Sequence, residues 1–414
     1  MLPAPSPRPF PYPPFAMLWQ PAIPEKYRQL TPAELADAIA RRRQELGKRL
    51  VILGHHYQTD EVVAHADFTG DSLKLSQLAA QVAASGEVEF VIFCGVHFMA
   101  ETADMLTPDH VAVILPDLSA GCSMADMAAY DDTVEAWNAI HASLKAQGWS
   151  GRVIPITYVN SSAAIKAFVG EHGGACCTSS NAAAVFAWAL AQAKPGEDIR
   201  ILFLPDQHLG RNTAAAAGID VARHSAVYDP VLTRKGRDLG GMTPDQLRDA
   251  KVILWAGHCS VHKLFRPEHC LQVREADKGD PNPTRILVHP ECCKEVVDHS
   301  DLTGSTEFII QTIDNAPPGS RWVVGTEVHL VSRLARRAAT RGVSVRILSD
   351  CQCLCTTMYR IDQPHLLWVL DALAAPGRKR VPNQVSVHPS VRERALLALD
   401  RMLSLSTKAK VAVE

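Results

Sequence analysis

Short apolar segments alternate along this chain with longer segments of helical periodicity. The apolar segments are rich in β-branched residues and occupy residues 50–53, 90–93, 111–115, 153–159, 201–204, 252–255, 285–288, 322–324 and 343–348. Strands that are apolar throughout and separated by helices are typical of parallel sheets with helices on both faces. The alternation therefore predicts an α/β fold made of βαβ units.

The size and charge of the chain limit its possible domain organisation and binding partners. With 414 residues, the chain exceeds the roughly 250–300 residues that one hydrophobic core usually supports, so we expect several domains. Its 42 Lys and Arg residues against 44 Asp and Glu residues give a formal net charge of −2. That balance leaves no basic excess for nucleic acid, and the apolar segments are far shorter than the roughly 20 residues of a membrane-spanning helix. We expect neither a nucleic acid nor a membrane as partner.

Three of the strands end alike, which indicates an internal repeat. Asp117, Asp206 and Asp350 close the sequences VILPD, LFLPD and RILSD. In the first and third copies a His, His97 or His329, precedes that Asp by 20 or 21 residues and opens a helical segment. Self-similarity of this kind predicts three related α/β/α domains with parallel sheets.

The cysteines fit this repeat. Eleven cysteines are an odd number in a chain without a secretory signal, which argues against a disulfide framework. Cys122 and Cys355 follow the Asp of their copies by five residues, and Cys259 follows the next strand of the middle copy. Because ligands collect beyond the carboxyl ends of parallel strands, three such ends facing one another would bring three thiols together. Three thiolates leave one metal position open, as in catalytic sites.

The same three cysteines open helical segments, where a helix N-terminus is expected to lower a thiol pKa. The other eight have structural interpretations: Cys94 lies within a strand, Cys270 belongs to no motif, and four others form vicinal pairs. Cys351 and Cys353 complete a C-x-C-x-C run that is too tight for one tetrahedral ion. Their use as substitute ligands or as a regulatory disulfide stays open.

The expected organisation has five parts. These are a proline-rich arm at residues 1–33, α/β domains at 34–148, 149–280 and 281–380, and a C-terminal helix and tail at 381–414. Nine prolines among the first 24 residues favour an extended arm rather than a signal peptide. Within the second domain, residues 220–250 are more polar and predict an excursion between strands.

Ten short motifs resemble those of the quinolinate synthase family, the A protein of bacterial NAD biosynthesis. In order they are GHHYQ at 54–58, GDSLKL at 70–75, AGCSMAD at 120–126, YVNS at 158–161, CTSSNA at 177–182, CSVH at 259–262, VHPE at 288–291, GST at 304–306, VGTE at 324–327 and CTTM at 355–358. The resemblance runs from about residue 35 to residue 375 and keeps the family's order. The polar stretch at 220–250 is similar to the insertion of the family's longer branch.

The resemblance implies pseudo-threefold α/β domains around a [4Fe–4S] cluster held by Cys122, Cys259 and Cys355. It also implies a cytoplasmic transferase that condenses iminoaspartate with dihydroxyacetone phosphate to quinolinate, phosphate and water. Iminoaspartate would come from an aspartate-oxidising enzyme. The reaction needs no net redox change, in keeping with a sequence that has neither a GxGxxG turn after a strand nor a P-loop.

Specific residues suit this chemistry. His55, Tyr57 and Glu291 are candidate acid–base groups. Helix starts and neutral donors suit substrates that carry carboxylates and a phosphate. The candidate substrate-binding residues are His55, Ser72, Tyr158, Asn160, Ser179, His289, Glu291, Ser305 and Thr306. The roles of His262 and Glu327 stay open at this stage.

Two alternatives remain. One is another three-cysteine iron–sulfur enzyme of similar architecture, which should lack the complete set of GHHY, YVNS and VHPE strand ends. The other is a non-catalytic iron–sulfur or zinc protein that senses redox state through the C-x-C-x-C run. That alternative predicts a filled coordination shell.

Overall fold

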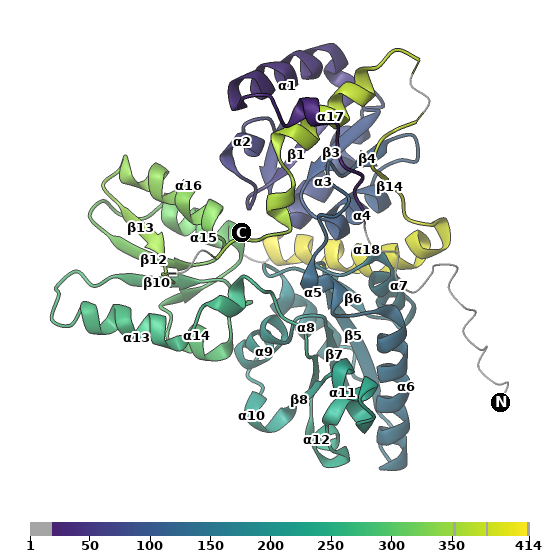
Figure 1. Ribbon diagram of the computed structural model, residues 1–414. Coiled ribbons are helices and arrows are strands. Elements are labelled where there is room, and N and C mark those ends of the chain that lie inside the picture. Colours follow the sequence, from purple (N-terminus) through teal and green to yellow (C-terminus); the bar gives the residue numbers. More distant parts are fainter. Residues whose placement is uncertain (1–18, 351–352, 378–379, 412–414) are drawn as a thin grey trace.

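The computed structural model describes residues 19–350, 353–377 and 380–411. Cys351 and most of the proline-rich arm lie outside these residues. Three separate sheets form three lobes, and the carboxyl ends of their strands face a common centre (Figure 1). The second and third sheets are parallel throughout, and the first is parallel apart from one edge strand. The predicted α/β fold class is confirmed.

The first sheet has the strand order β14-β4-β3-β1-β2. Its strands are β1 (Leu50–His55), β2 (Phe68–Gly70), β3 (Phe90–Cys94), β4 (Ala112–Ile114) and the antiparallel edge strand β14 (Gln384–Val385). The helices nearest to them are α1 (Pro32–Leu46), α2 (Asp60–Val63), α3 (Ser72–Ala83) and α4 (His97–Leu106). β1 is buried along its whole length because every side chain is apolar except His55 at its end.

The second sheet has the order β6-β5-β7-β9-β8 and is parallel throughout. Its strands are β5 (Arg152–Tyr158), β6 (Ala175–Cys177), β7 (Ile199–Leu204), β8 (Ser225–Tyr228) and β9 (Val252–Trp255). Its helices are α6 (Tyr130–Ala146), α7 (Ala163–Glu171), α8 (Ala182–Leu190) and α9 (Gln207–Ala216). The segment expected to be an excursion therefore adds an edge strand, β8, to this sheet.

The third sheet has the order β11-β10-β12-β13. Its strands are β10 (Arg285–Val288), β11 (Leu302–Thr303), β12 (Arg321–Gly325) and β13 (Ser344–Ile347). Its helices are α13 (Pro267–Ala276), α14 (Lys294–Asp298), α15 (Thr306–Asp314) and α16 (Val328–Ala339). The remaining short elements are α5 (Ser123–Asp126), α10 (Val221–His224), α11 (Pro230–Arg234), α12 (Pro244–Asp249) and the 3-10 turns η1 (Glu25–Tyr27), η2 (Gly47–Arg49), η3 (Asp238–Gly241), η4 (His262–Leu264) and η5 (Met358–Arg360).

One strand order recurs in all three sheets. When the added edge strands β14 and β8 are left out, β4-β3-β1-β2, β9-β7-β5-β6 and β13-β12-β10-β11 are the same arrangement of fourth, third, first and second strand. Each candidate ligand cysteine follows the fourth strand of its copy: Cys122 follows β4, Cys259 follows β9 and Cys355 follows β13. The repeat that the sequence indicated thus has a counterpart in the topology.

The C-terminal part of the chain returns to the first two lobes. Helix α17 (Gln363–Ala374) packs on α1, and its Leu366 and Leu370 lie in the core of the first sheet, although this segment falls within the third domain predicted at residues 281–380. Helix α18 (Pro389–Val411) packs on α7. A Cβ at Gly170 would lie 2.0 Å from the Arg394 carbonyl oxygen, so this close approach requires glycine.

None of the helices within the described residues combines the length and the hydrophobicity needed to cross a lipid bilayer.

Candidate active site

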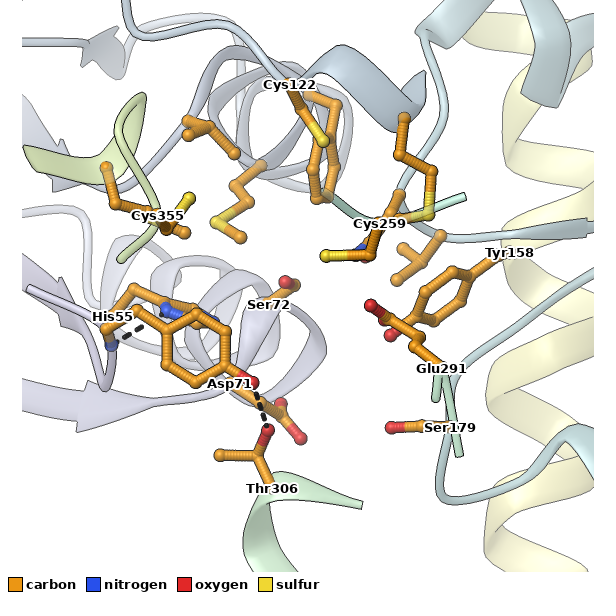
Figure 2. A pocket seen from close by; sticks show the side chains of 18 of the residues that line it. His55, Asp71, Ser72, Cys122, Tyr158, Ser179, Cys259, Glu291, Thr306 and Cys355 are labelled. Carbon is orange, nitrogen blue, oxygen red and sulfur yellow. Dashed lines mark hydrogen bonds between the residues drawn. The ribbon is translucent and has the colours of Figure 1, made fainter. Parts of the chain in front are cut away.

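A single cavity is lined by residues from all three lobes at the carboxyl ends of their strands (Figure 2). Twelve of the candidate residues named from the sequence line it: His55, Tyr57, Ser72, Cys122, Tyr158, Asn160, Ser179, Cys259, His289, Glu291, Thr306 and Cys355. Ser305 does not line the cavity. Its Oγ accepts a hydrogen bond from Phe308 N (3.3 Å) and caps α15.

Equivalent positions of the three lobes supply polar side chains to the cavity. His55 ends β1, Tyr158 ends β5 and His289 directly follows β10, and these are the first strands of the three copies. The side chains two positions later also line the cavity: Tyr57, Asn160 and Glu291. Three copies of one strand end have therefore acquired different acid–base and hydrogen-bonding groups around one space.

The second strand of each copy leads to a polar helix start. Ser72 opens α3 after β2, and Thr306 opens α15 after β11, while Ser179 lies in the turn between β6 and α8. All three line the cavity, and no Lys or Arg is among the described lining residues. An anion in this cavity would be held by neutral donors and the free N–H groups of α3 and α15, rather than by a cationic side chain.

The two strand-end histidines share one local geometry. The backbone N–H of Tyr57 donates to Nδ1 of His55 (3.1 Å), and the backbone N–H of Glu291 donates to Nδ1 of His289 (3.3 Å). Burial lowers the pKa of each ring to about 3. Because Nδ1 accepts in both neutral rings, the proton resides on Nε2, so both histidines offer a neutral N–H donor at the cavity wall.

A buried hydrogen-bond chain links Tyr57 to Glu291. Tyr57 Oη lies 3.0 Å from Thr326 Oγ1, Thr326 Oγ1 lies 3.1 Å from His262 Nε2, and His262 Nδ1 lies 2.8 Å from Glu291 Oε2. The carboxylate can only accept, so Nδ1 donates to it. With a ring proton on Nδ1, Nε2 can accept from Thr326, whose oxygen can in turn accept from Tyr57. In that arrangement the hydrogen bonds run in one direction, from the phenol to the carboxylate.

The two ends of this hydrogen-bond chain differ in charge. Burial raises the pKa of Tyr57, and the nearby Glu291 carboxylate raises it further, so the phenol is neutral. Burial alone would also raise the pKa of Glu291, but His262 and then His289 hold it well below its usual range. Burial, followed by the Glu291 charge, raises the pKa of Tyr158 well above its ordinary value. Glu291 is thus an ionised carboxylate between neutral hydroxyl donors.

The three thiols of Cys122, Cys259 and Cys355 converge on one part of the cavity (Figure 2). Burial raises the pKa of Cys122 to about 12, raises that of Cys259 well above its usual value, and raises that of Cys355. The expectation that helix starts lower these pKa values is wrong. Backbone N–H groups do favour each thiolate, but each following helix is a single short turn and burial outweighs it.

This donor set fits an iron–sulfur cluster. Each thiolate charge disfavours the next, since Cys355 raises the pKa of Cys122, and both raise that of Cys259. A bound cationic centre would remove that penalty and release the protons. Apolar side chains, among them Met124, Val261 and Met358, surround the thiols. Soft thiolates in an apolar wall are ligands that suit iron–sulfur centres.

Two residues in or beside the cavity were not singled out from the sequence. Asp71 caps α3 by accepting from Lys74 N (2.9 Å), and burial raises the pKa of its carboxyl group. Thr326 does not line the cavity, yet it connects Tyr57 to His262. Both lie inside recognised motifs, next to the residues that drew attention, Ser72 and Glu327. The motif alone does not show which of two neighbouring residues caps a helix or bridges two side chains. The packing in the structure does.

The fold and the site are those of a three-lobed α/β protein with a thiol-lined, acid–base-equipped cavity. Residues 37–404 match the family described as Quinolinate synthetase A protein, so the chain belongs to that family. It is 50% identical over 382 residues to Quinolinate synthase of Acidobacterium capsulatum, covering 92% of this chain and 95% of the relative. Identity to Quinolinate synthase of Bacillus velezensis is 49% over 382 residues, covering 92% and 96%. For Quinolinate synthase of a Nocardioides species it is 52% over 366 residues, covering 88% and 87%.

Proposed function

We propose that the chain condenses iminoaspartate with dihydroxyacetone phosphate to form quinolinate, phosphate and water. The observation that carries this proposal is the single cavity in which three thiols lie beside His55, Tyr57 and Glu291. The relatives that share about half of its residues carry the name Quinolinate synthase. Both substrates are anions, which suits a cavity rich in neutral donors and helix starts.

Cys122, Cys259 and Cys355 would hold a [4Fe–4S] cluster. When bound through three thiolates, such a cluster supplies an iron with an open position, a Lewis acid for a carboxylate, hydroxyl or imine nitrogen. A competing donor set exists, because ligand atoms of Cys259, His262 and Glu291 lie within 4.8 Å of one another. The direct His262–Glu291 hydrogen bond occupies two of those three groups, which favours the three-thiolate arrangement.

Different side chains of the protein would carry out different proton transfers. His55 and Tyr57 stand together, with ring centroids 4.7 Å apart, and would serve the isomerisation of the triose. Glu291 starts as an ionised carboxylate and would accept a proton during dehydration or ring closure. Once Tyr57 has given its own proton to the substrate, the protonated carboxyl group could restore it through Thr326 and His262, with each hydrogen bond between them reversed.

The polar groups around the cavity would orient the two substrates. Ser72 at the start of α3 and Thr306 at the start of α15 would bind carboxylate or phosphate oxygens with the help of the helix N–H groups. Ser305 would act indirectly by capping α15. The remaining neutral donors in the cavity wall are Tyr158, Asn160, Ser179, His55 and His289.

The cellular context follows from the chemistry. Iminoaspartate is an imine and must be supplied by an enzyme that oxidises aspartate. All cysteines within the described residues are free thiols, which supports a reducing compartment, and we propose the cytoplasm.

The proposed function can be tested on anaerobically reconstituted protein. Quinolinate formation from iminoaspartate and dihydroxyacetone phosphate is measured for the wild type and for C122A, C259A and C355A, with C94A as the buried-cysteine control. We expect quinolinate and a full complement of iron and sulfide in the wild type and in C94A, and loss of both in the other three. A fully loaded cluster without product would reject the enzymatic proposal. A cluster that survives all three substitutions would reject the ligand set.

A further inference from the structure

One arginine of the third lobe forms hydrogen bonds with the turn that carries Tyr57. Arg333 lies on α16, and its guanidinium donates from Nη1 to the His56 carbonyl (3.0 Å) and from Nη2 to the Gln58 carbonyl (2.7 Å). Its Nε donates to the Asp60 carboxylate (2.8 Å). The two carbonyls flank Tyr57 on either side. A planar, forked donor is suited to contacts of this kind, which an ammonium group cannot reproduce.

Other hydrogen bonds also hold the turn. The backbone N–H of His56 donates to the Gly70 carbonyl (3.2 Å), and the side-chain amide of Gln58 donates to the Met358 carbonyl (3.1 Å). After β1 ends at His55, the backbone N–H of Tyr57 donates to the His55 ring, and the N–H of Gln58 donates to the His55 carbonyl (3.0 Å). The Tyr57 hydroxyl reaches Thr306 (3.3 Å) and Thr326 (3.0 Å), which also belong to the third lobe. The position of Tyr57 is therefore set by the neighbouring lobe at both its backbone and its hydroxyl.

We propose that Arg333 is a positioning residue for Tyr57. By holding the carbonyls of His56 and Gln58, it fixes the turn so that the Tyr57 hydroxyl stays within hydrogen-bonding distance of Thr326. The proposal rests on the proposed function, in which Tyr57 moves protons. Tyr57 and Glu291 come from different lobes. A displacement of the turn would therefore break the series of hydrogen bonds that connects the two side chains.

The chain contains its own matched control. Arg336 lies three residues further along α16 and binds the same Asp60 carboxylate, but it makes no contact with the carbonyls among the hydrogen bonds of the described residues. Its side chain is 60% exposed, against 23% for Arg333. Removing Arg336 thus tests the loss of a charge and an Asp60 ion pair without loss of the carbonyl contacts.

The test compares wild type, R333M, R333K and R336M as anaerobically reconstituted holoenzymes. For each, kcat and KM are measured together with cluster content and amide hydrogen exchange across residues 55–62. We expect kcat to fall about 10- to 100-fold in R333M, because small misplacements of reacting groups have effects of this size. KM and cluster content should change little, and the Tyr57 and Gln58 amides should exchange faster. R333K should recover only part of the loss, and R336M should behave as wild type.

Three results would overturn the proposal. A fall in kcat without faster exchange would mean that Arg333 acts in another way, and faster exchange without a fall in kcat would mean that the turn need not be fixed. An equal defect in R336M would assign the effect to charge alone. If the wild type makes no quinolinate, the proposed function fails, whereas exchange still shows whether Arg333 holds the turn.

Discussion

Nδ1 of His262 lies 2.8 Å from Oε2 of Glu291, and both side chains are almost completely buried. The pair joins the loop that bears Cys259 to the strand end that bears His289. It keeps a carboxylate ionised at the edge of the thiol-lined cavity, where burial alone would raise its pKa. A base at this position is the feature of the site on which the proposed proton transfers depend most.

Glu291→Gln should remove that base while preserving its shape. We expect kcat for quinolinate formation to fall by roughly 10²- to 10⁴-fold, the usual contribution of a general acid–base group. Cluster content should remain at the wild-type level, since Glu291 is not one of the proposed ligands. Glu295→Gln, four residues along the chain and exposed, is the control. A variant E291Q with more than a tenth of wild-type activity would contradict the assignment.

Thr326 should matter through its hydroxyl alone. Thr326→Val keeps the shape but breaks the contacts to Tyr57 and His262, so kcat should fall about 5-fold, as expected for the loss of a hydrogen bond worth about 1 kcal/mol. Thr326→Ser should restore most of the activity. The measurement is steady-state kinetics of the three proteins at equal cluster content. Equal rates for the Val and Ser variants would show that the hydroxyl is not needed.

His208 should make the protein less stable in acid. Burial, followed by the Arg211 charge, lowers the pKa of His208 to about 4, and its Nδ1 has no hydrogen-bond partner among the described residues. Its contribution to stability is therefore complete above pH 6.5 and is lost as the pH falls toward 4, because only the unfolded state binds the proton. Wild type should lose up to about 1.4 kcal/mol per pH unit from this residue in that range.

Chemical denaturation of wild type and His208→Gln between pH 8 and pH 5 checks this. The difference in the free energy of unfolding should be constant above pH 7 and should shift in favour of the variant below pH 6.5. Parallel curves over the whole range would contradict the pKa assignment.

Gly257 should be essential for the position of Cys259. A Cβ at residue 257 would lie 2.2 Å from the Pro205 carbonyl oxygen, so Gly257→Ala must displace the loop that leads to Cys259, a proposed ligand. We expect a loss of about 1–3 kcal/mol of stability and reduced iron per chain. Gly279→Ala, where φ is +80° and no atom lies within 4 Å, controls for backbone strain. Full iron content in G257A would contradict this prediction.

The strands and their convergence could be predicted from the sequence because both depend on local pattern. The run LVILGH has no polar residue before its end, which favours a strand buried on both faces and places His55 at the carboxyl edge. The rule that ligands collect at that edge then brings His55, Tyr158 and His289 to one space. Their roles stay predictions.

Other features depend on long-range packing. β8 is only four residues long, alternates between buried and partly buried side chains, and lies among polar residues, so its local pattern does not predict a strand clearly. Helical periodicity predicts α17 but does not say that Leu366 and Leu370 join the first sheet. The pKa values of the thiols were predicted in the wrong direction because the degree of burial cannot be seen in a local motif.

The most direct test of the central claim is Mössbauer spectroscopy of the ⁵⁷Fe-reconstituted protein during titration with quinolinate. If Cys122, Cys259 and Cys355 hold a [4Fe–4S] cluster with one open iron, the product should change the signal of a single iron site and leave the others as they were. An unchanged spectrum at saturating quinolinate, or a cluster in which every iron already has a protein ligand, would contradict the account.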